Sequence, residues 1–254
     1  MIRKLFFVHT VFFLTLNACA QSSTEVADTT VEKEKPTPSK THIKLTTRLH
    51  TRGMFLYGGR ISTDNPAFDV NFTLNRPKWG FFFYKAIDIK DHTSDNNFAL
   101  LALYKNFKLS ERLTITPHIG LFFEQMHGVA DTGSDMSVIA VTAYKISPHL
   151  TIDYTALVGN VMMEPEEMDW VNRGRLLFVS KHVDLTASYW HNNHLLDEQD
   201  HMAGSLMANY KLRLSDAFNM SIGATEFLIF KSSDEEELPK TSRFLVTLAL
   251  QYVK

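Results

Sequence analysis

The sequence predicts an all-β protein, a transmembrane antiparallel up-and-down β-barrel of about twelve strands. Three observations lead to this prediction: period-two alternation of apolar and polar residues, connections that alternate between short and long, and an unusual composition. The chain of 254 residues contains 19 Phe and 8 Tyr, yet it is 44% hydrophobic with a mean hydropathy of −0.12. That hydropathy excludes a bundle of apolar spanning helices. A membrane barrel is aromatic-rich and only mildly hydrophobic because half of each strand faces a polar interior.

The first twenty residues are predicted to be a signal peptide that directs the chain out of the cytoplasm. A short basic start is followed by an apolar run from Leu5 to Leu16, which is too short to cross a bilayer as a helix. Two processing alternatives remain open. Ala18-Cys19-Ala20 fits a small-x-small cleavage site, while Leu16 to Cys19 is similar to a bacterial lipobox and makes Cys19 a lipidation candidate. Because Cys19 is the single cysteine, an internal disulfide and a cysteine zinc site are excluded.

Two further regions follow the signal. Residues 21–41 are rich in Ser, Thr, Glu, Lys and Pro and offer almost nothing to bury, so they are predicted to form a disordered periplasmic spacer. Residues 42–254 are predicted to form the barrel. A net charge of −2 argues against nucleic acid as a partner.

The strand prediction rests on alternation. Residues 68–75 read Phe-Asp-Val-Asn-Phe-Thr-Leu-Asn, which places apolar side chains on one face and polar side chains on the other. Pro117 falls inside one predicted strand, where it removes a donor from the hydrogen-bond ladder. Strands are predicted at 43–57, 67–75, 79–89, 97–107, 111–124, 137–146, 149–159, 173–180, 183–191, 203–212, 217–230 and 242–253.

The connections sort by length and by charge. Tight turns are predicted at 76–78, 108–111, 147–148, 181–182 and 214–216, and long loops at 59–66, 90–96, 125–136, 160–172, 192–202 and 231–241. This alternation is typical of bacterial outer-membrane barrels and puts both termini on the periplasmic side. The long loops carry sixteen acidic and four basic residues, whereas the turns and their edges are basic. Solvated loop tips explain the acidic clusters, and divalent cations at a lipopolysaccharide surface are the alternative; no cofactor is predicted.

If the apolar face meets lipid, the polar residues of the strands point into the lumen. They then form either a pore lining or a salt-bridge network that fills a narrow barrel. The pore-lining candidates are Arg48, Arg52, Asp69, Asn71, His118, Glu124, Asp153, Arg173, Arg175, Asp184, Lys211, Arg213 and Arg243. The wider inward set adds His50, Asn75, Ser188, Asn209 and Glu226.

Two strands are apolar on both faces, namely 79–84 and 98–104. In these strands Phe82, Leu101 and Leu103 are expected on the inner side, where packing against an inward-folded loop is favoured over a hydrophobic pore lining.

An enzymatic alternative rests on one loop edge. His191 and His194, with Asp197 or Asp200, have the residue types of a hydrolase site or a metal site. No serine stands at a recognisable nucleophile elbow.

The first hairpin resembles the opening of the TorF-type family of outer-membrane porins. The resemblance is carried by Arg52-Gly53, by residues 62–68 (Ser-Thr-Asp-Asn-Pro-Ala-Phe) and by Gly80-Phe81, and it covers about forty residues. In this chain residues 54–59 lengthen the segment between the first two elements. The resemblance implies a diffusion channel with no catalytic residues.

The leading functional hypothesis is a passive, porin-like channel for small polar or ionic solutes in the outer membrane of a Gram-negative bacterium. The expected partners are outer-membrane lipid and lipopolysaccharide, small solutes and the barrel-assembly machinery. The alternatives are an outer-membrane lipid-modifying hydrolase and a non-conducting structural or surface-binding barrel.

Overall fold

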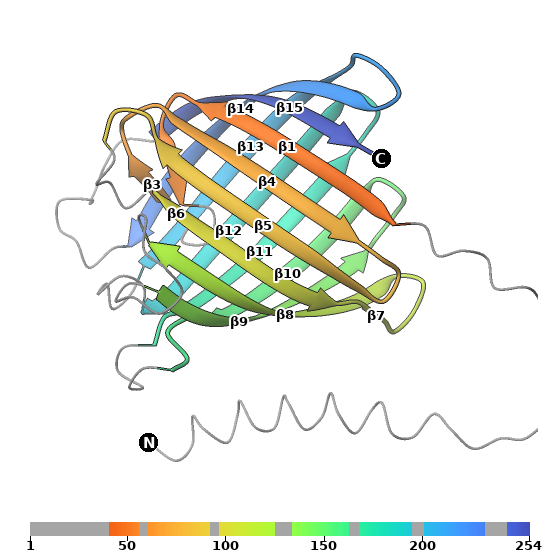
Figure 1. Ribbon diagram of the computed structural model, residues 1–254, viewed down its shortest axis with the longest axis horizontal. Helices are drawn as coiled ribbons and strands as arrows, with labels where there is room; N and C mark the ends of the chain where they lie inside the picture. Colours follow the sequence, from red (N-terminus) through yellow and green to blue (C-terminus); the bar gives the residue numbers. More distant parts are fainter. Residues whose placement is uncertain are drawn as a thin grey trace, which may run out of the picture. The chain divides into compact units, whose positions relative to one another are not determined.

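The computed structural model describes residues 41–55, 60–91, 97–124, 134–162, 168–194, 201–231 and 243–254. These residues form a closed antiparallel β-barrel (Figure 1). Among the described residues there is no helix with the length and apolar character to cross a membrane. The predicted signal peptide and spacer, with Cys19, lie outside the described residues.

The described strands are β1 (His42–His50), β2 (Gly53–Phe55), β3 (Arg60–Thr63), β4 (Ala67–Asn75), β5 (Trp79–Asp88), β6 (Phe98–Lys105), β7 (Phe107–Lys108), β8 (Leu113–Glu124), β9 (Ser134–Lys145), β10 (Leu150–Val158), β11 (Trp170–Val179), β12 (Val183–His194), β13 (His201–Arg213), β14 (Phe218–Lys231) and β15 (Arg243–Val253).

The barrel closes because its first and last strands are neighbours. Each wall strand pairs antiparallel with the next along the chain, and β1 pairs with both β4 and β15. At this closing seam Arg48 is opposite Ala249, and Ile43 and Lys254 exchange backbone hydrogen bonds of 2.8 and 2.9 Å. With β7 counted as the end of β6, the described ring has twelve strands, as predicted.

Pro117 explains why β6 and β7 are separate. The pairing of Tyr104 with His118 and the pairing of Phe107 with Ile115 have the same register, so the two segments continue one line along β8. Between them Lys105 and Asn106 have no partner on β8, because Lys105 stands opposite the proline, which has no N–H. The Thr116 hydroxyl donates instead to the Asn106 side chain at 3.2 Å. A closed barrel therefore accommodates a mid-strand proline at the cost of a short interruption.

Four tight turns share one serine-based motif. In each, a serine follows an apolar residue and precedes another apolar residue by three positions: Ser110, Ser147, Ser180 and Ser215. The serine Oγ accepts a hydrogen bond from the backbone N–H three residues on, at 3.0 to 3.1 Å. The serine N–H donates to the carbonyl of the same residue. This local bonding fixes the turn and hence the register of each hairpin.

The predicted first strand, 43–57, is too long, and the predicted loop 59–66 contains the strand β3. The barrel strand β1 ends at His50, a bend follows at Thr51 and Arg52, and β2 pairs with β3 as a separate small hairpin. Three predicted loops are also too long, since β9, β11 and β13 begin at Ser134, Trp170 and His201, and β12 runs to His194. The residues added at these ends are mostly polar on both faces, so the alternation gives no signal there.

The two faces of the wall differ as the alternation predicts. The outward positions carry exposed large hydrophobic side chains on strand after strand, for example Leu103, Ile119, Leu206, Phe230 and Phe244, which are 54–64% exposed. A continuous outward apolar surface of this kind is what membrane barrels present to lipid. The alternate positions point into the lumen, where the buried residues lie.

Candidate functional site

The inner wall has two levels. The turn-side half lies toward the tight turns, and the loop-side half lies toward the longer connections. The loop-side half holds a cluster of buried apolar residues, here called the apolar tier: Tyr84, Ala86, Phe98, Leu100, Ile139, Leu157, Val171, Trp190, Ala203, Phe227 and Leu245.

The apolar tier is packed rather than solvated. Phe98 and Leu245 are 0% exposed although both project into a barrel lumen. Phe98 packs against Tyr84 and Phe122, with ring centroids 5.5 and 5.2 Å apart. Water therefore does not reach these side chains, and the lumen at this level is filled.

The turn-side half is polar, and three cross-strand ion pairs lie within it or at its border with the apolar tier. Arg48 Nε lies 2.8 Å from Asp69 Oδ1, between β1 and β4. Arg175 binds Asp153 through Nε and Nη2, the closer contact being 2.6 Å, between β11 and β10. The third pair joins Lys211 Nζ to Asp184 Oδ1 at 2.6 Å, between β13 and β12. Side chains on neighbouring strands reach each other because they share the inner face.

Asp69 is the centre of a buried network at the closing seam. Its carboxylate accepts hydrogen bonds from Arg48 Nε and from the Tyr84 hydroxyl, and His50 Nε2 lies 2.6 Å from Oδ2. Because an ionised carboxylate only accepts, His50 Nε2 carries the proton. His50 Nδ1 lies 2.8 Å from the Thr247 hydroxyl on β15. The network therefore ties β4, β1 and β15 together.

This Thr-His-Asp chain is not arranged as a hydrolase. His50 is 4% exposed and Asp69 is 2% exposed, and the carboxylate is already engaged by a guanidinium and a phenol. A working site needs an accessible nucleophile and donors for an oxyanion. The role of this chain is structural.

The remaining pore-lining candidates occupy varied places. Asn71 and His118 are half-buried on the inner wall, and the His118 ring lies 5.0 Å from that of Tyr104. Arg173 donates to Thr155 at 3.1 Å, and Arg243 is half-buried opposite Phe227. The structure gives no side-chain description of Glu124.

Two candidates lie beyond the wall. Arg52 sits in the bend after β1, 3.5 Å from Asp64, because the first strand ends two residues earlier. Arg213 ends β13 and pairs with Asp216 at the exposed turn. Both residues are at a mouth of the barrel rather than along its length.

Three residues expected on the inner face point outward instead. Glu226 is exposed, and its register partners Leu206 and Phe244 are outward apolar residues. Its polarity alone misassigned it, since Thr225 and Phe227 are the buried neighbours. Leu101 and Leu103 also face outward, while Leu100 and Ala102 are buried inside. Phe82 does pack against the apolar tier as expected.

The predicted histidine cluster is only partly described. His191 occupies an outward position on β12, where its carbonyl accepts a hydrogen bond from Asn172 Nδ2 at 3.1 Å. The side chain of His194 and residues 195–200 lie outside the described residues. Within the described ranges no group of three or more His, Cys, Asp or Glu side chains could hold a metal ion. The acidic loop clusters at 164–167 and 234–237 are likewise outside these ranges.

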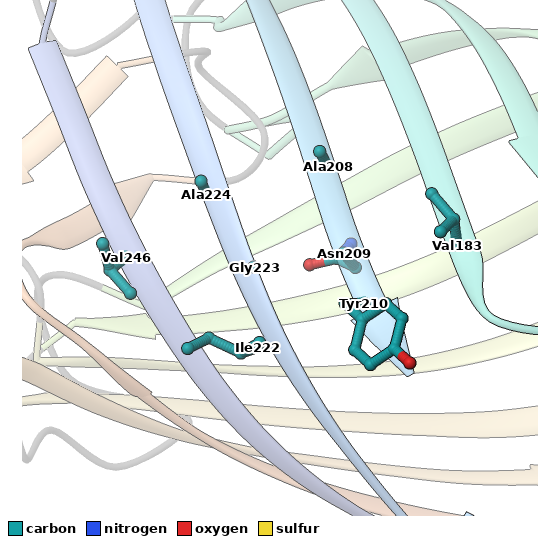
Figure 2. A pocket seen from close by; sticks show the side chains of 8 residues that line it. All are labelled: Val183, Ala208, Asn209, Tyr210, Ile222, Gly223, Ala224 and Val246. Carbon is teal, nitrogen blue, oxygen red and sulfur yellow. The ribbon is translucent and has the colours of Figure 1, made fainter. Parts of the chain in front are cut away.

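A hollow of about 340 Å³ lies over β12–β15 (Figure 2). The side chains of Ala208 and Ala224, which face each other across β13 and β14, are flanked by Tyr210, Ile222 and Val246. These residues occupy outward positions, so the hollow belongs to the apolar outer surface. No titratable side chain other than Tyr210 lines it, and it offers no chemistry for a reaction.

No protein-family model matches the sequence, and no curated protein matches it. Solved structures do match. The chain is similar to the KdgM porin, with a TM-score of 0.56 and 7% identity over 82% of this chain and 98% of that one. It is also similar to the NanC porin, with a TM-score of 0.54 and 9% identity over 82% and 98% of the two chains.

A further match is the KdgM porin in complex with disordered oligogalacturonate, with a TM-score of 0.53 and 6% identity over 83% of this chain and 98% of that one. Identities this low establish the fold alone. The chain therefore has the closed antiparallel barrel fold that is found in outer-membrane porins.

Proposed function

We propose that the protein is a passive channel for small polar or ionic solutes in the outer membrane of a Gram-negative bacterium. The observation that carries this proposal is the polar turn-side half of the lumen, lined by Arg48, Arg175, Lys211 and their carboxylate partners. Charged side chains on an inner wall stabilise and select ions that pass along it. The likeness to porin structures supports the same role.

The apolar tier is then the narrow part of the channel. Its packed side chains favour the alternative function, a barrel that spans the membrane without conducting. A channel must open a path beside Phe98, Trp190 and Phe227, which are at most 5% exposed. Brief movements of the side chains at this level open a path for solutes through a lumen that is filled at rest.

Planar lipid bilayers distinguish the two functions. The purified barrel, checked for folding by its resistance to SDS at room temperature, is added to one side at about 1 M KCl. Discrete conductance steps are expected for a channel. A folded barrel that stays silent over long recordings contradicts the proposal and leaves the structural role.

The remaining parts of the proposal concern processing and partners. Residues 1–20 act as a cleaved signal or, with Cys19 lipidated, as a lipoprotein signal, and residues 21–41 act as a periplasmic spacer. The barrel-assembly machinery inserts the barrel with both termini in the periplasm, and lipopolysaccharide surrounds its outer half. Kinship with TorF-type porins fits the same role. Mass spectrometry of the mature N-terminus separates cleavage after residue 20 from lipidation at Cys19.

A further inference from the structure

Two of the three ion pairs are layered, with the carboxylate against the wall and the cation toward the lumen, whereas in the third pair the Lys211 and Asp184 side chains are 29% and 28% exposed. The Asp69 side chain is 3% exposed and that of its partner Arg48 is 22% exposed. The corresponding values are 6% for Asp153 and 28% for Arg175. Although each pair is neutral as a whole, a solute in the lumen meets the guanidinium first.

Lys44 adds a cation that the ion pairs do not neutralise. It is exposed on β1, at a register position shared with the inward Thr73. Its ammonium interacts with the charges of Arg48, Lys211 and Asp184. Asp184 already binds Lys211 at 2.6 Å, so the described structure gives Lys44 no carboxylate of its own.

The wall between these cations is small and uncharged. The strands β15 and β14 separate β1 from β13, and they present Ala249, Gln251, Ser221 and Gly223 to the lumen. A Cβ at Gly223 would lie 2.0 Å from Asn209 Oδ1, so the Asn209 carboxamide rests directly over the glycine. No carboxylate projects inward from the described residues of β14 and β15. Lys44 and Lys211 therefore face each other across a neutral trough.

The rim of the barrel at the tight turns is also positively charged. Its exposed side chains include Glu111 and Asp216 as acids. Against these two stand the exposed cations Arg76, Lys78, Lys108, Arg112, Lys145, Lys181, Arg213 and Lys254. A rim of one sign leading into a lumen of the same sign raises the local concentration of counter-ions.

We propose that the turn-side half of the lumen is an anion filter, in which Lys44, Arg48, Arg175 and Lys211 select small anions over cations. This inference rests on the channel function proposed above and names the class of solute that it passes. Lys44 is the specificity-determining residue that can be changed most cleanly, since the described structure shows no ion pair that depends on it.

The test is the zero-current potential in a tenfold KCl gradient across a planar bilayer. The wild-type channel is expected to reverse near the chloride equilibrium potential. Lys44→Glu should shift the reversal toward the potassium equilibrium potential, and Lys44→Gln should give an intermediate shift. Raising both salt concentrations should reduce the selectivity, because screening weakens exposed charges.

Lys105→Glu is the matched control. Lys105 lies at the same end of the barrel but on its outward face, where its ammonium is 4.8 Å from the centroid of the Phe107 ring. The charge change is the same, and the reversal potential should stay at the wild-type value. An effect equal to that of Lys44→Glu overturns the filter.

The failures of the two proposals are distinguishable. Conductance with a cation-selective or unselective reversal overturns the anion filter and leaves the channel intact. A folded barrel without conductance overturns both. If Lys44→Glu does not fold, Lys44→Gln carries the test, and an unshifted reversal in that variant contradicts the proposal.

Discussion

At the scale of single residues, the buried network around Asp69 is the most consequential feature of the wall. Its carboxylate serves three donors from β1 and β5, so removing it leaves several buried polar groups without a partner. Breaking a buried ion pair on one side is costly because the other charge stays buried.

Asp69→Ala is therefore expected to lower the free energy of unfolding by about 3–5 kcal/mol. Urea titration of the barrel in lipid vesicles, followed by tryptophan fluorescence, measures this change. Asp216→Ala is the control, since Asp216 is 98% exposed in a turn ion pair and its loss should leave the midpoint in place. Equal effects of the two variants would show that the network contributes nothing.

Glu226 gives a second prediction at this scale. Because its side chain lies among outward apolar residues, Glu226→Leu should stabilise the barrel in lipid, by about 1–2 kcal/mol on the scale of acidic residues at lipid-facing sites. The same urea titration applies, with Glu226→Gln giving a smaller gain. A loss of stability with both variants would indicate that the carboxylate has a partner.

The sequence could place Asp69 and Arg48 on the inner face, because the alternation within each strand shows which residues point inward. It could not pair them, since ion-pair partners depend on which strands become neighbours and at what register. Glu226 was wrongly expected on the inner face because only its polarity was considered. The other residues on its face of β14 form a regular outward row. The parity of Phe218, Ile222 and Leu228 in the same strand would have identified it as outward.

At the scale of elements, the four serine turns carry much of the register information. Each serine satisfies two backbone groups of its own turn without help from elsewhere. This motif is visible in the sequence as an apolar residue, a serine, two variable residues and an apolar residue. The positions of the turns were predicted from the sequence, but their shared serine motif was not.

Ser147→Ala should cost about 0.5–1.5 kcal/mol, the net value of one hydrogen bond, and the quadruple alanine variant should cost several times that. Unfolding midpoints in lipid vesicles measure both. Ser221→Ala, on the inner wall away from the turns, is the control. If the quadruple variant unfolds like the wild type, the turns are set by the strands instead.

The ends of the strands on the loop side were the least predictable elements. Polar residues such as Ser134, Asn192 and His201 continue the ladder without any alternation in polarity. Backbone pairing propagates there from the regular part of each strand, a cooperative effect that a local pattern does not contain. In the β2–β3 hairpin, β2 was included in the predicted strand 43–57, and β3 fell in the predicted loop 59–66.

At the scale of the whole molecule, the division of the lumen into a polar half and the apolar tier determines how it conducts. Period-two alternation predicted an inward face that is polar except on the two strands that are apolar on both faces, 79–84 and 98–104. Phe98 and Leu245 are apolar residues on inward positions of strands that are also apolar outside, so the pattern did not show which face they occupy, and Val171 fell in the predicted loop 160–172. The long connections and the even strand number did predict the closed ring.

Phe98→Ala combined with Phe227→Ala should raise the single-channel conductance, because it removes two rings from the packed level. Each substitution should also destabilise the barrel by about 3–5 kcal/mol, so folding must be checked first. Leu103→Ala and Ile119→Ala, on the outward face, should leave the conductance unchanged. A double variant that folds and conducts like the wild type would show that the narrowest part of the channel lies elsewhere.

The closing seam has a consequence for how the molecule comes into being. His50 and Thr247, which touch across it, are separated by 197 positions along the chain. During folding, one edge of β1 therefore stays unpaired until β15 has reached it. Any barrel shortened at its C-terminal end keeps two open edges, and it is a template for aggregation rather than a smaller version of the protein.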